Sequence, residues 1–351
     1  MKKILSNLFL LLLLVSCTSQ PQQSTLVYDD FAQTQELTSK ELPLDTAVFR
    51  YPFRIHIQDR MAAVLDLHGA DHFLQLFSYP DFRHIASFGK RGDSPDDMLS
   101  VENIRWDGQF LWTLDANKRE LTKFAFSKSD GSPLRDETVS LDKKILRALD
   151  FVQCDDSNFI IPDYSGDNRF CMVNRKGELL YKFGTIPTSN EDALAHSRPA
   201  LAQAWRSFID YNPRKKVLAA VTQLGEVLEI YNLKDTASQI VRIGPNGEPK
   251  FKIARGYSIP TGIMGFSDVQ VTDKAIYAAF QGRTFKELAS QPKDKKVNGG
   301  QYIYVFSLKG EPLMKYVLNR HINGISVDEK RGIITATDVN SDEPIVEYRM
   351  K

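Results

Sequence analysis

The 351 residues include 45 Lys and Arg against 44 Asp and Glu, so the formal net charge is only +1 at pH 7. This balance leaves no basic field that would draw the chain to nucleic acid, and we expect no nucleic-acid partner. With 42% hydrophobic residues the chain can bury a large core, and its length alone would allow two domains.

Residues 1–16 have the layout of a signal peptide. Lys2 and Lys3 supply a positive start, and Leu8 to Val15 form an apolar run of eight residues. A helix that spans a bilayer needs about 20 apolar residues, so this run has instead the length of a signal-peptide core. Without Lys2 and Lys3 the mature chain would carry 43 basic and 44 acidic side chains, a net charge of −1.

The signal peptide ends in Leu14-Val15-Ser16-Cys17, which resembles the lipobox of bacterial lipoproteins. The resemblance implies cleavage before Cys17 and lipidation of its sulfur, which would hold the chain to a membrane. An ordinary secretory peptide with a chance cysteine is the alternative. Because Thr18 rather than Asp follows, and no acidic run is present, similarity to known lipoproteins favours the outer membrane and its periplasmic side over the cell surface. Residues 17–25 are polar and uncharged and are expected to form a lipidated flexible tether.

From residue 26 to residue 351 the sequence repeats with a period of about 50 residues. Apolar runs begin at 62, 110, 158, 217, 275 and 332, and each is followed by a second apolar run. Each copy has room for four strands, and radial stacking would cover both faces of each small sheet with its neighbours. The repeat predicts an all-β fold, a six-bladed β-propeller with four antiparallel strands per blade. Two packed sheets or a β-helix are the alternatives.

The sixth copy stops at Lys351, after its third strand. We expect its fourth strand from residues near Leu42 to Phe49, because an N-terminal strand there would close the ring and remove an open sheet edge. A helix is expected around Asn190 to Ala204. We expect the closed ring to be a monomer.

One segment carries a distinctive motif. Ser87 to Met98 reads SFGKRGDSPDDM. It resembles the FGxxGxGPxEF segment that ends a blade in TolB-like six-bladed propeller lipoproteins of Bacteroidota, and it departs from that pattern at Ser94, Asp97 and Met98. The resemblance implies the same fold for the mature chain and supplies no agreed activity.

The longest connections all fall on one face of the predicted propeller. In blades of strands A to D, the B–C loops and D–A crossovers share a face, here called the looped face; the A–B and C–D turns form the short-turn face. The connections at 90–100, 185–204, 245–262 and 281–300 belong to the looped face. Insertions also collect wherever packing permits them, but loops on a rigid scaffold usually carry function. We therefore expect this face to bind an envelope protein or a glycan. The candidate residues are Lys90, Arg91, Asp93, Asp66, Asp115, Asp163 and Arg283.

A second in-phase set begins strand A of the copies and would ring the mouth of the central channel. Glu102, Asp150, Asp268 and Asn323 offer the oxygen ligands that calcium takes. Gluconolactonase-type six-bladed propellers hold a catalytic divalent metal in such a ring, so a metal-dependent hydrolase or lactonase is the second hypothesis. Strand ends also favour Asp and Asn for turn capping alone, and Arg54 could neutralise the ring. We expect no cofactor, with a divalent cation such as calcium as the alternative, and we assign no catalytic residue.

Cys154 and Cys171 remain after lipidation of Cys17. The repeat places Cys154 at the end of strand A and Cys171 early in strand C, with strand B between them. Two strand spacings amount to roughly 9.5 Å, whereas a disulfide needs Cα atoms closer than about 7 Å. We expect both thiols to be reduced.

Overall fold

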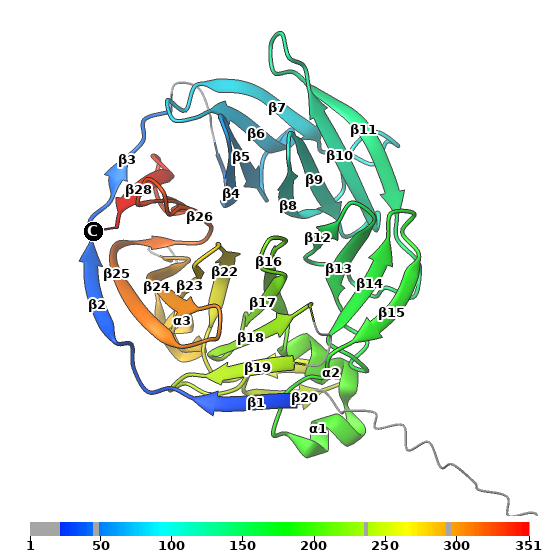
Figure 1. The fold of residues 1–351 in the computed structure, drawn as a ribbon, viewed down its shortest axis with the longest axis vertical. Helices are drawn as coiled ribbons and strands as arrows, with labels where there is room; N and C mark the ends of the chain where they lie inside the picture. Colours follow the sequence, from blue (N-terminus) through cyan, green and yellow to red (C-terminus); the bar gives the residue numbers. More distant parts are fainter. Residues whose placement is uncertain (1–21, 45–48, 235–237, 293–295, 351) are drawn as a thin grey trace, which may run out of the picture.

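Six small sheets stand radially around a central channel (Figure 1). The computed structural model describes residues 22–44, 49–234, 238–292 and 296–350. Within these residues, the six sheets follow one another in chain order around the ring, with the first strand of each nearest the channel. The six-bladed propeller predicted from the repeat is confirmed.

The first three blades each contain four antiparallel strands from one continuous stretch of chain. Blade 1 consists of β4 (Pro52–Gln58), β5 (Met61–Asp66), β6 (His72–Ser78) and β7 (His84–Lys90). Blade 2 consists of β8 (Val101–Asp107), β9 (Phe110–Asp115), β10 (Glu120–Phe126) and β11 (Pro133–Ser140). Blade 3 consists of β12 (Val152–Asp155), β13 (Asn158–Pro162), β14 (Phe170–Asn174) and β15 (Leu179–Phe183).

The last three blades are completed by strands from the N-terminal side of the chain. Blade 4 consists of β16 (Ser207–Asn212), β17 (Val217–Thr222), β18 (Val227–Asn232) and β19 (Ser238–Ile243), with β1 (Gln22–Val27) outside them. Blade 5 consists of β22 (Phe266–Val271), β23 (Ala275–Phe280), β24 (Gly300–Ser307) and β25 (Pro312–Ile322), with β2 (Gln33–Leu37) outside them. Blade 6 consists of β26 (Ile325–Asp328), β27 (Ile333–Thr337), β28 (Ile345–Arg349) and β3 (Lys40–Glu41).

The N-terminal strands form a belt along the rim of blades 4, 5 and 6 (Figure 1). β1 and β2 pair in parallel with β19 and β25, and β3 pairs antiparallel with β28. The two parallel strands were not predicted, and β1 begins inside the segment 17–25 that we expected to be a tether.

An N-terminal strand closes blade 6, but it lies at Lys40–Glu41 and not at 42–49 as predicted. Leu42 adds one further hydrogen bond, from its N–H to the carbonyl of Ile345 at 3.0 Å. Leu42, Leu44 and Phe49, whose apolar character suggested a strand, pack instead into a core cluster with blade 1. Residues 45–48 of the predicted strand lie outside the described residues.

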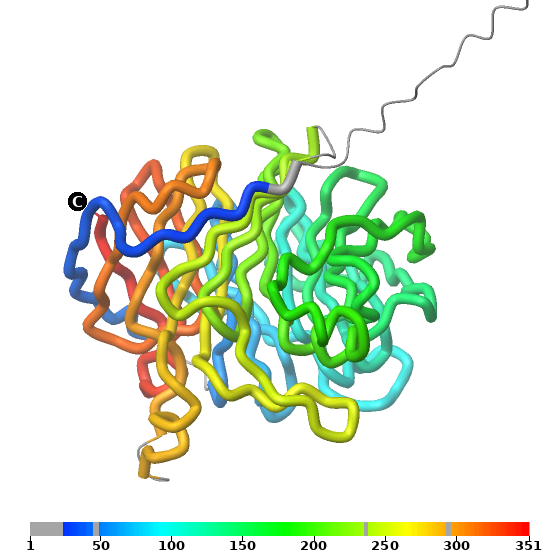
Figure 2. The backbone as a smooth tube through the Cα atoms, turned by 90° about the horizontal axis from the view of Figure 1, so that it is seen from below, coloured from blue at the N-terminus to red at the C-terminus, as the bar shows by residue number. Residues whose placement is uncertain are grey.

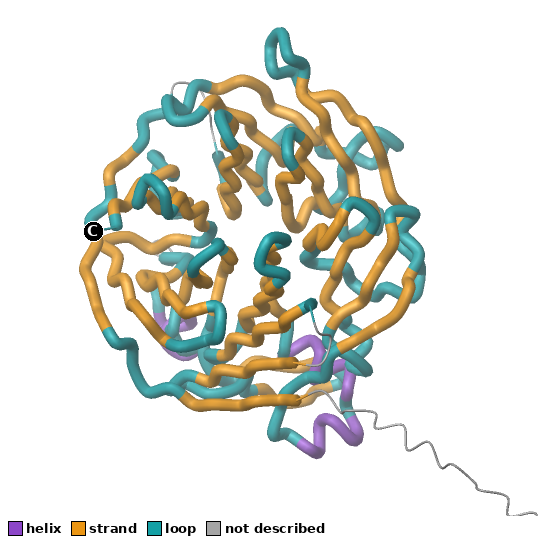
Figure 3. The backbone as a smooth tube through the Cα atoms, viewed as in Figure 1, coloured by secondary structure: helices purple, strands orange, loops and turns teal. Residues whose placement is uncertain are grey.

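The helices and one extra hairpin lie in the long connections (Figure 3). α1 (Glu191–His196) and α2 (Arg198–Ala204) precede blade 4 and replace the single helix predicted there, with a break at Ser197. β20 (Phe251–Ala254) and β21 (Tyr257–Pro260) form a hairpin before blade 5, and α3 (Phe285–Ser290) lies between β23 and β24. No helix in the described residues is long and apolar enough to cross a membrane.

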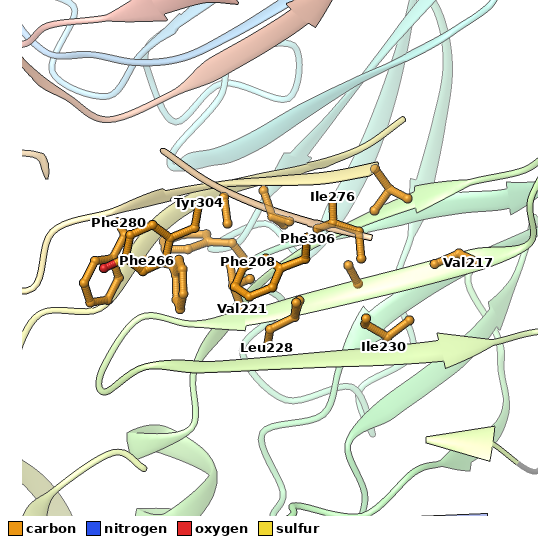
Figure 4. Packing of buried hydrophobic residues seen from close by; sticks show 14 of the residues in the cluster. Phe208, Val217, Val221, Leu228, Ile230, Phe266, Ile276, Phe280, Tyr304 and Phe306 are labelled. Carbon is orange, nitrogen blue, oxygen red and sulfur yellow. The ribbon is translucent and has the colours of Figure 1, made fainter. Parts of the chain in front are cut away.

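The hydrophobic core lies between neighbouring blades and not within them. Every residue of β17 and of β23 is buried, because each sheet is covered on both faces. Between blades 4 and 5, Phe208 and Val221 pack with Phe266 and Phe306 (Figure 4). Burial of both faces explains why the first apolar run of each repeat, which forms the second strand of its blade, is continuously apolar in the sequence.

Cys154 and Cys171 are both free, as predicted. β13 lies between β12, which carries Cys154, and β14, which carries Cys171. Burial raises the pKa of each thiol to about 12, so both stay protonated and unreactive at neutral pH.

Truncation of Leu37 tests how much the belt contributes to stability. Leu37 of β2 is buried against Tyr316 and Leu318 of β25, so Leu37→Ala should lower the free energy of unfolding by about 2–5 kcal/mol. Glu36→Ala is the matched control, because Glu36 is exposed on the same strand. Urea unfolding measures both, and equal effects of the two variants would show that the belt is not packed as described.

Candidate functional site

The innermost strands of the blades are sheet edges, so their outer N–H groups need acceptors from elsewhere. Side chains of the neighbouring blade supply these acceptors across the channel wall. The bonds run from Ile209 N–H to Asp150 (2.8 Å), from Val271 N–H to Asp210 (2.6 Å), from Ile325 N–H to Asp268 (2.9 Å) and from Ile57 N–H to Ser326 Oγ (3.2 Å). They join blade 3 to 4, 4 to 5, 5 to 6 and 6 to 1.

Two buried arginines fill the channel between these acceptors. Arg54 is fully buried, and its Nε lies 3.3 Å from Asp268 Oδ1. Its guanidinium carbon lies 4.1 Å from the ring centroid of Phe53 and 4.6 Å from that of Phe208. These two rings and the carboxylate together compensate the buried charge.

Arg105 joins blade 2 to its neighbours on both sides. Its Nη2 lies 3.3 Å from Asp150 Oδ1, and its Nη1 lies 2.8 Å from Nε2 of His56. Burial, with Arg105 and Arg54 nearby, holds the pKa of His56 well below its usual value. His56 is therefore neutral and accepts a hydrogen bond from Arg105.

The predicted metal ligands do not form a metal site in this arrangement. Asp150 and Asp268 are occupied by arginines and backbone N–H groups, and Glu102 lies 3.5 Å from Arg206. Asn323 is buried, and its Oδ1 has no hydrogen-bond partner. Within the described ranges, no three His, Cys, Asp or Glu side chains lie close enough together to hold a cation. The donor set does not fit a resident metal, and we derive no chemistry from one.

The predicted binding residues at the ends of the second strands hold the loops in place. Asp66, Asp115 and Asp163 are buried, and each accepts hydrogen bonds from nearby backbone N–H groups. The donors include Tyr51 N–H to Asp66 (2.8 Å), Leu99 N–H to Asp115 (2.7 Å) and Ser165 N–H to Asp163 (3.0 Å). These carboxylates order the looped face and are not open to a ligand.

In the motif around Lys90, some residues hold the loop in place and others are exposed at the surface. Arg91 donates from Nε to the carbonyl of Gly69 at 3.0 Å and from Nη2 to that of Leu67 at 2.8 Å, with its guanidinium over the ring of Phe73. Lys90 is exposed and lies 3.4 Å from Asp97. Asp93 is also exposed. Lys90 and Asp93 can meet a partner, whereas Arg91 fixes the turn.

Arg283, the last predicted residue, lies between two cavities of the looped face. A cavity of about 160 Å³ at the channel mouth is lined by Tyr51, Phe53 and Asn323 among others. A cavity of about 310 Å³ beside it lies against β24 and β25. Gln281 and Arg283 line both cavities, so the two form one hollow surface with Arg283 at its centre.

A cavity of about 410 Å³ lies on the short-turn face. Its acidic residues serve the turns that surround it. Asp328 accepts the N–H of Lys330 at 3.0 Å, and Asp273 lies 2.7 Å from Arg214. These two acidic groups therefore serve turn formation.

The β20–β21 hairpin projects from the looped face (Figure 2, the yellow loop), and some of its apolar residues are exposed. Tyr257 and Ile259 are 65% and 50% exposed. In the hairpin register they share one face with Lys252. On β21, Ser258 N–H donates to Gln203 of α2 at 3.1 Å, so α2 supports the hairpin and leaves Tyr257 and Ile259 uncovered.

The fold and these sites can be compared with known proteins. A family model described as TolB-like 6-blade propeller-like matches residues 30–330. The chain belongs to the TolB-like six-bladed propeller family. The resemblance of residues 87–98 to that family is thereby confirmed, and the match extends over most of the chain. None of the curated proteins matches this TolB-like propeller.

Solved structures show the same fold at low sequence identity. An exported protein of Bacteroides fragilis is 11% identical, with a TM-score of 0.57, and the match covers 93% of this chain and 100% of that one. A DUF4221-family member of Bacteroides vulgatus is 11% identical, with a TM-score of 0.54 and coverage of 90% and 97%. The WD40 repeats of RRP9 are 9% identical, with a TM-score of 0.52 and coverage of 89% and 97%. At these identities the likeness shows the fold alone.

Sequence reasoning placed the long insertion on the looped face but predicted neither the hollow nor all of its lining. The insertion at 281–300 pointed to Arg283, but Lys315, Tyr302 and His321 were not singled out as binding residues. They lie on two ordinary strands, where their spacing carries no local signal. The hairpin residues Tyr257 and Ile259 lie in a connection that was recognised only by its length.

Asp268→Asn separates a structural role of the channel acids from metal binding. The variant keeps an acceptor for Ile325 N–H but leaves the buried charge of Arg54 without its carboxylate, so we expect a loss of about 3–5 kcal/mol in the free energy of unfolding. The matched control Asp273→Asn breaks a surface pair with Arg214 and should cost at most about 1 kcal/mol. Thermal and urea unfolding should be unchanged by a chelator; a chelator effect as large as that of Asp268→Asn would instead indicate a metal.

Proposed function

We propose that this TolB-like propeller is a lipid-anchored envelope protein that binds a protein or glycan partner through its looped face. One observation carries the proposal. The two cavities lined by Arg283 and the exposed hairpin residues Tyr257 and Ile259 lie on the looped face. The first described strand, β1, begins instead near the short-turn face. The exported protein of Bacteroides fragilis with the same fold agrees with an envelope location.

The path of β1 sets the orientation. Gln22 pairs with Ser238, at the start of β19 and next to the short turn that links β18 to β19. β1 therefore begins near the short-turn face, as the start of the blue segment in Figure 2 shows. Four residues separate Cys17 from Gln22, a span of at most about 18 Å. A lipid on Cys17 would hold the short-turn face near the membrane and point the looped face away from it.

Basic residues near the start of β1 support this orientation. Lys215 and Lys216 in the turn after β16 are exposed, as is Lys234 in the turn after β18, whereas Arg214 beside them is paired with Asp273. Leu233 N–H donates to the carbonyl of Lys216 at 2.8 Å, so the two turns lie together. Anionic lipid headgroups attract each such side chain by about 1 kcal/mol.

Substitution of Cys17 tests the anchor. Cys17→Ala removes the thiol that the lipid would modify, so cells grown with radiolabelled palmitate should yield unlabelled protein that is either soluble or unprocessed. Cys154→Ala is the control, because its thiol belongs to the folded propeller, and it should label as the wild type does. Label retained in Cys17→Ala would exclude lipidation at this position.

A photo-crosslinking amino acid at two positions tests which face meets the partner. Placed at Tyr257 on the looped face, it should give discrete crosslinked species in intact cells. Placed at Lys274, exposed on the short turn between β22 and β23, it should give none of them. Ile259→Asp, which places a charge in the same exposed apolar patch, should abolish the Tyr257 species. Crosslinks from Lys274 instead of Tyr257 would contradict the proposed binding face.

A further inference from the structure

We infer that the cavity beside β24 and β25 binds the oxyanion group, carboxylate, sulfate or phosphate, of a ligand that enters from the looped face. This inference rests on the proposed binding role of that face. The cavity, here called the Arg283 cavity, has a volume of about 310 Å³ and is lined by Arg283, Gln301, Tyr302, Lys315 and His321 among others. Its walls come from the blade 5 insertion and from two strands of the same sheet.

Arg283 differs from the other enclosed arginines of the protein. Arg54, Arg105 and Arg169 each lie within 4.0 Å of a carboxylate. Arg242, which has none so close, donates to the carbonyls of Lys309 and Gly310. In the part of the chain that the structure describes, Arg283 forms no ion pair and donates only from Nη2, to the carbonyl of Gly299 at 2.6 Å. Its Nε is buried without a hydrogen-bond partner, as are the Nε atoms of Arg54 and Arg105, but those two arginines lie beside carboxylates.

A second cation lies in the same cavity. Lys315 forms no ion pair with any described carboxylate, and its Nζ lies 4.8 Å from the ring centroid of Tyr302 and 5.8 Å from that of Tyr304. The two rings hold the ammonium group at the cavity wall through cation–π attraction. Unlike a carboxylate, they leave its hydrogen-bond donors free.

The one acidic residue of the lining is already occupied. Glu287 Oε2 accepts from Thr284 N–H at 2.7 Å and from Thr284 Oγ1 at 2.8 Å, which caps α3. These bonds lower the pKa of Glu287 and fix its carboxylate at the helix start. The Glu287 carboxylate is near enough to attract Arg283, but neither Arg283 nor Lys315 forms an ion pair with it, so the cavity contains two cations without a paired carboxylate.

A guanidinium with free donors beside an ammonium group is suited to an oxyanion. Guanidinium groups bind carboxylate and phosphate oxygens in pairs, and these charge-assisted bonds are the strong ones. Gln281, which lines this cavity and the one at the channel mouth, offers neutral donors and acceptors to the rest of the ligand. The arrangement thus fits an acidic ligand, of which a uronic acid is one example.

The test is titration calorimetry at low ionic strength on the full chain, purified in a mild detergent. The probes are glucuronate, glucose, sodium sulfate and sodium phosphate. We expect saturable binding of at least one oxyanion and none of glucose. Glucuronate alone would indicate a carboxylate ligand, whereas sulfate or phosphate alone would indicate a tetrahedral one. Saturation by none of the three oxyanions, or equal binding of glucose, would overturn the inference.

Two substitutions test whether the oxyanion binds in this cavity. Arg283→Gln and Lys315→Gln should each weaken oxyanion binding by about tenfold or more, because each removes a charged hydrogen bond. Lys274→Gln, a surface lysine of the same blade on the opposite face, should leave it unchanged. Unchanged binding in Arg283→Gln and Lys315→Gln would overturn the site. The Tyr257 crosslinks distinguish the two proposals. If the protein with an intact Arg283 cavity binds no oxyanion but still gives the Tyr257 crosslinks, the oxyanion site is refuted and the binding face is not.

Discussion

The inner edge of each blade is the constraint on which the structure depends. A four-stranded blade leaves the N–H groups of its first strand without a neighbour strand, and these groups must be satisfied where six such edges meet. Carboxylates such as Asp150 and Asp268 meet this need by reaching to the next blade. The same carboxylates face Arg105 and Arg54, so hydrogen bonds and charge compensation depend on one another. The result is a channel wall that fixes the positions of all the loops above it.

The outer edges of blades 4, 5 and 6 are covered by strands, whereas the inner edges are satisfied by side chains. At the rim of blades 4 and 5, whole strands from the N-terminal side cover the edge by parallel pairing. At blade 6 the two residues of β3 suffice, together with Leu42 and the ion pair of Arg320 with Glu41. Core contacts of Leu37 and Leu42 then tie the belt to the spaces between the blades.

The architecture was predictable because stacking imposes a period on the sequence, and the period survives when individual residues vary. Function was less predictable, because the position of a residue within its repeat fixes where it lies in the propeller but not what it does there. Asp150 and Asp268 do ring the channel, yet they accept N–H groups and face arginines, and a sequence cannot show which neighbours its carboxylates will meet. Gly89 and Gly244, which lie near the ends of β7 and β19, illustrate the same limit. Gly89 has a φ of +65°, whereas Gly244 is required by the side chain of Glu226, to which a Cβ would come within 2.2 Å. β1 was missed because a rim strand pairs through its backbone, and QQSTLV shows little apolar alternation.

The order of the belt has a mechanical consequence. A pull on the N-terminal end of the chain reaches β1 first, and β1 lies parallel to β19 with six residues in register. Because the strands are parallel, a pull along β1 loads their hydrogen bonds together in shear, and not one by one as in unzipping. Only after β1 and then β2 had been drawn away would the load reach β3, which closes the ring. β3, which closes the ring through only two paired residues, is thus the last of the three strands to bear tension. The ring is therefore shielded from forces that act on the N-terminal end of the chain.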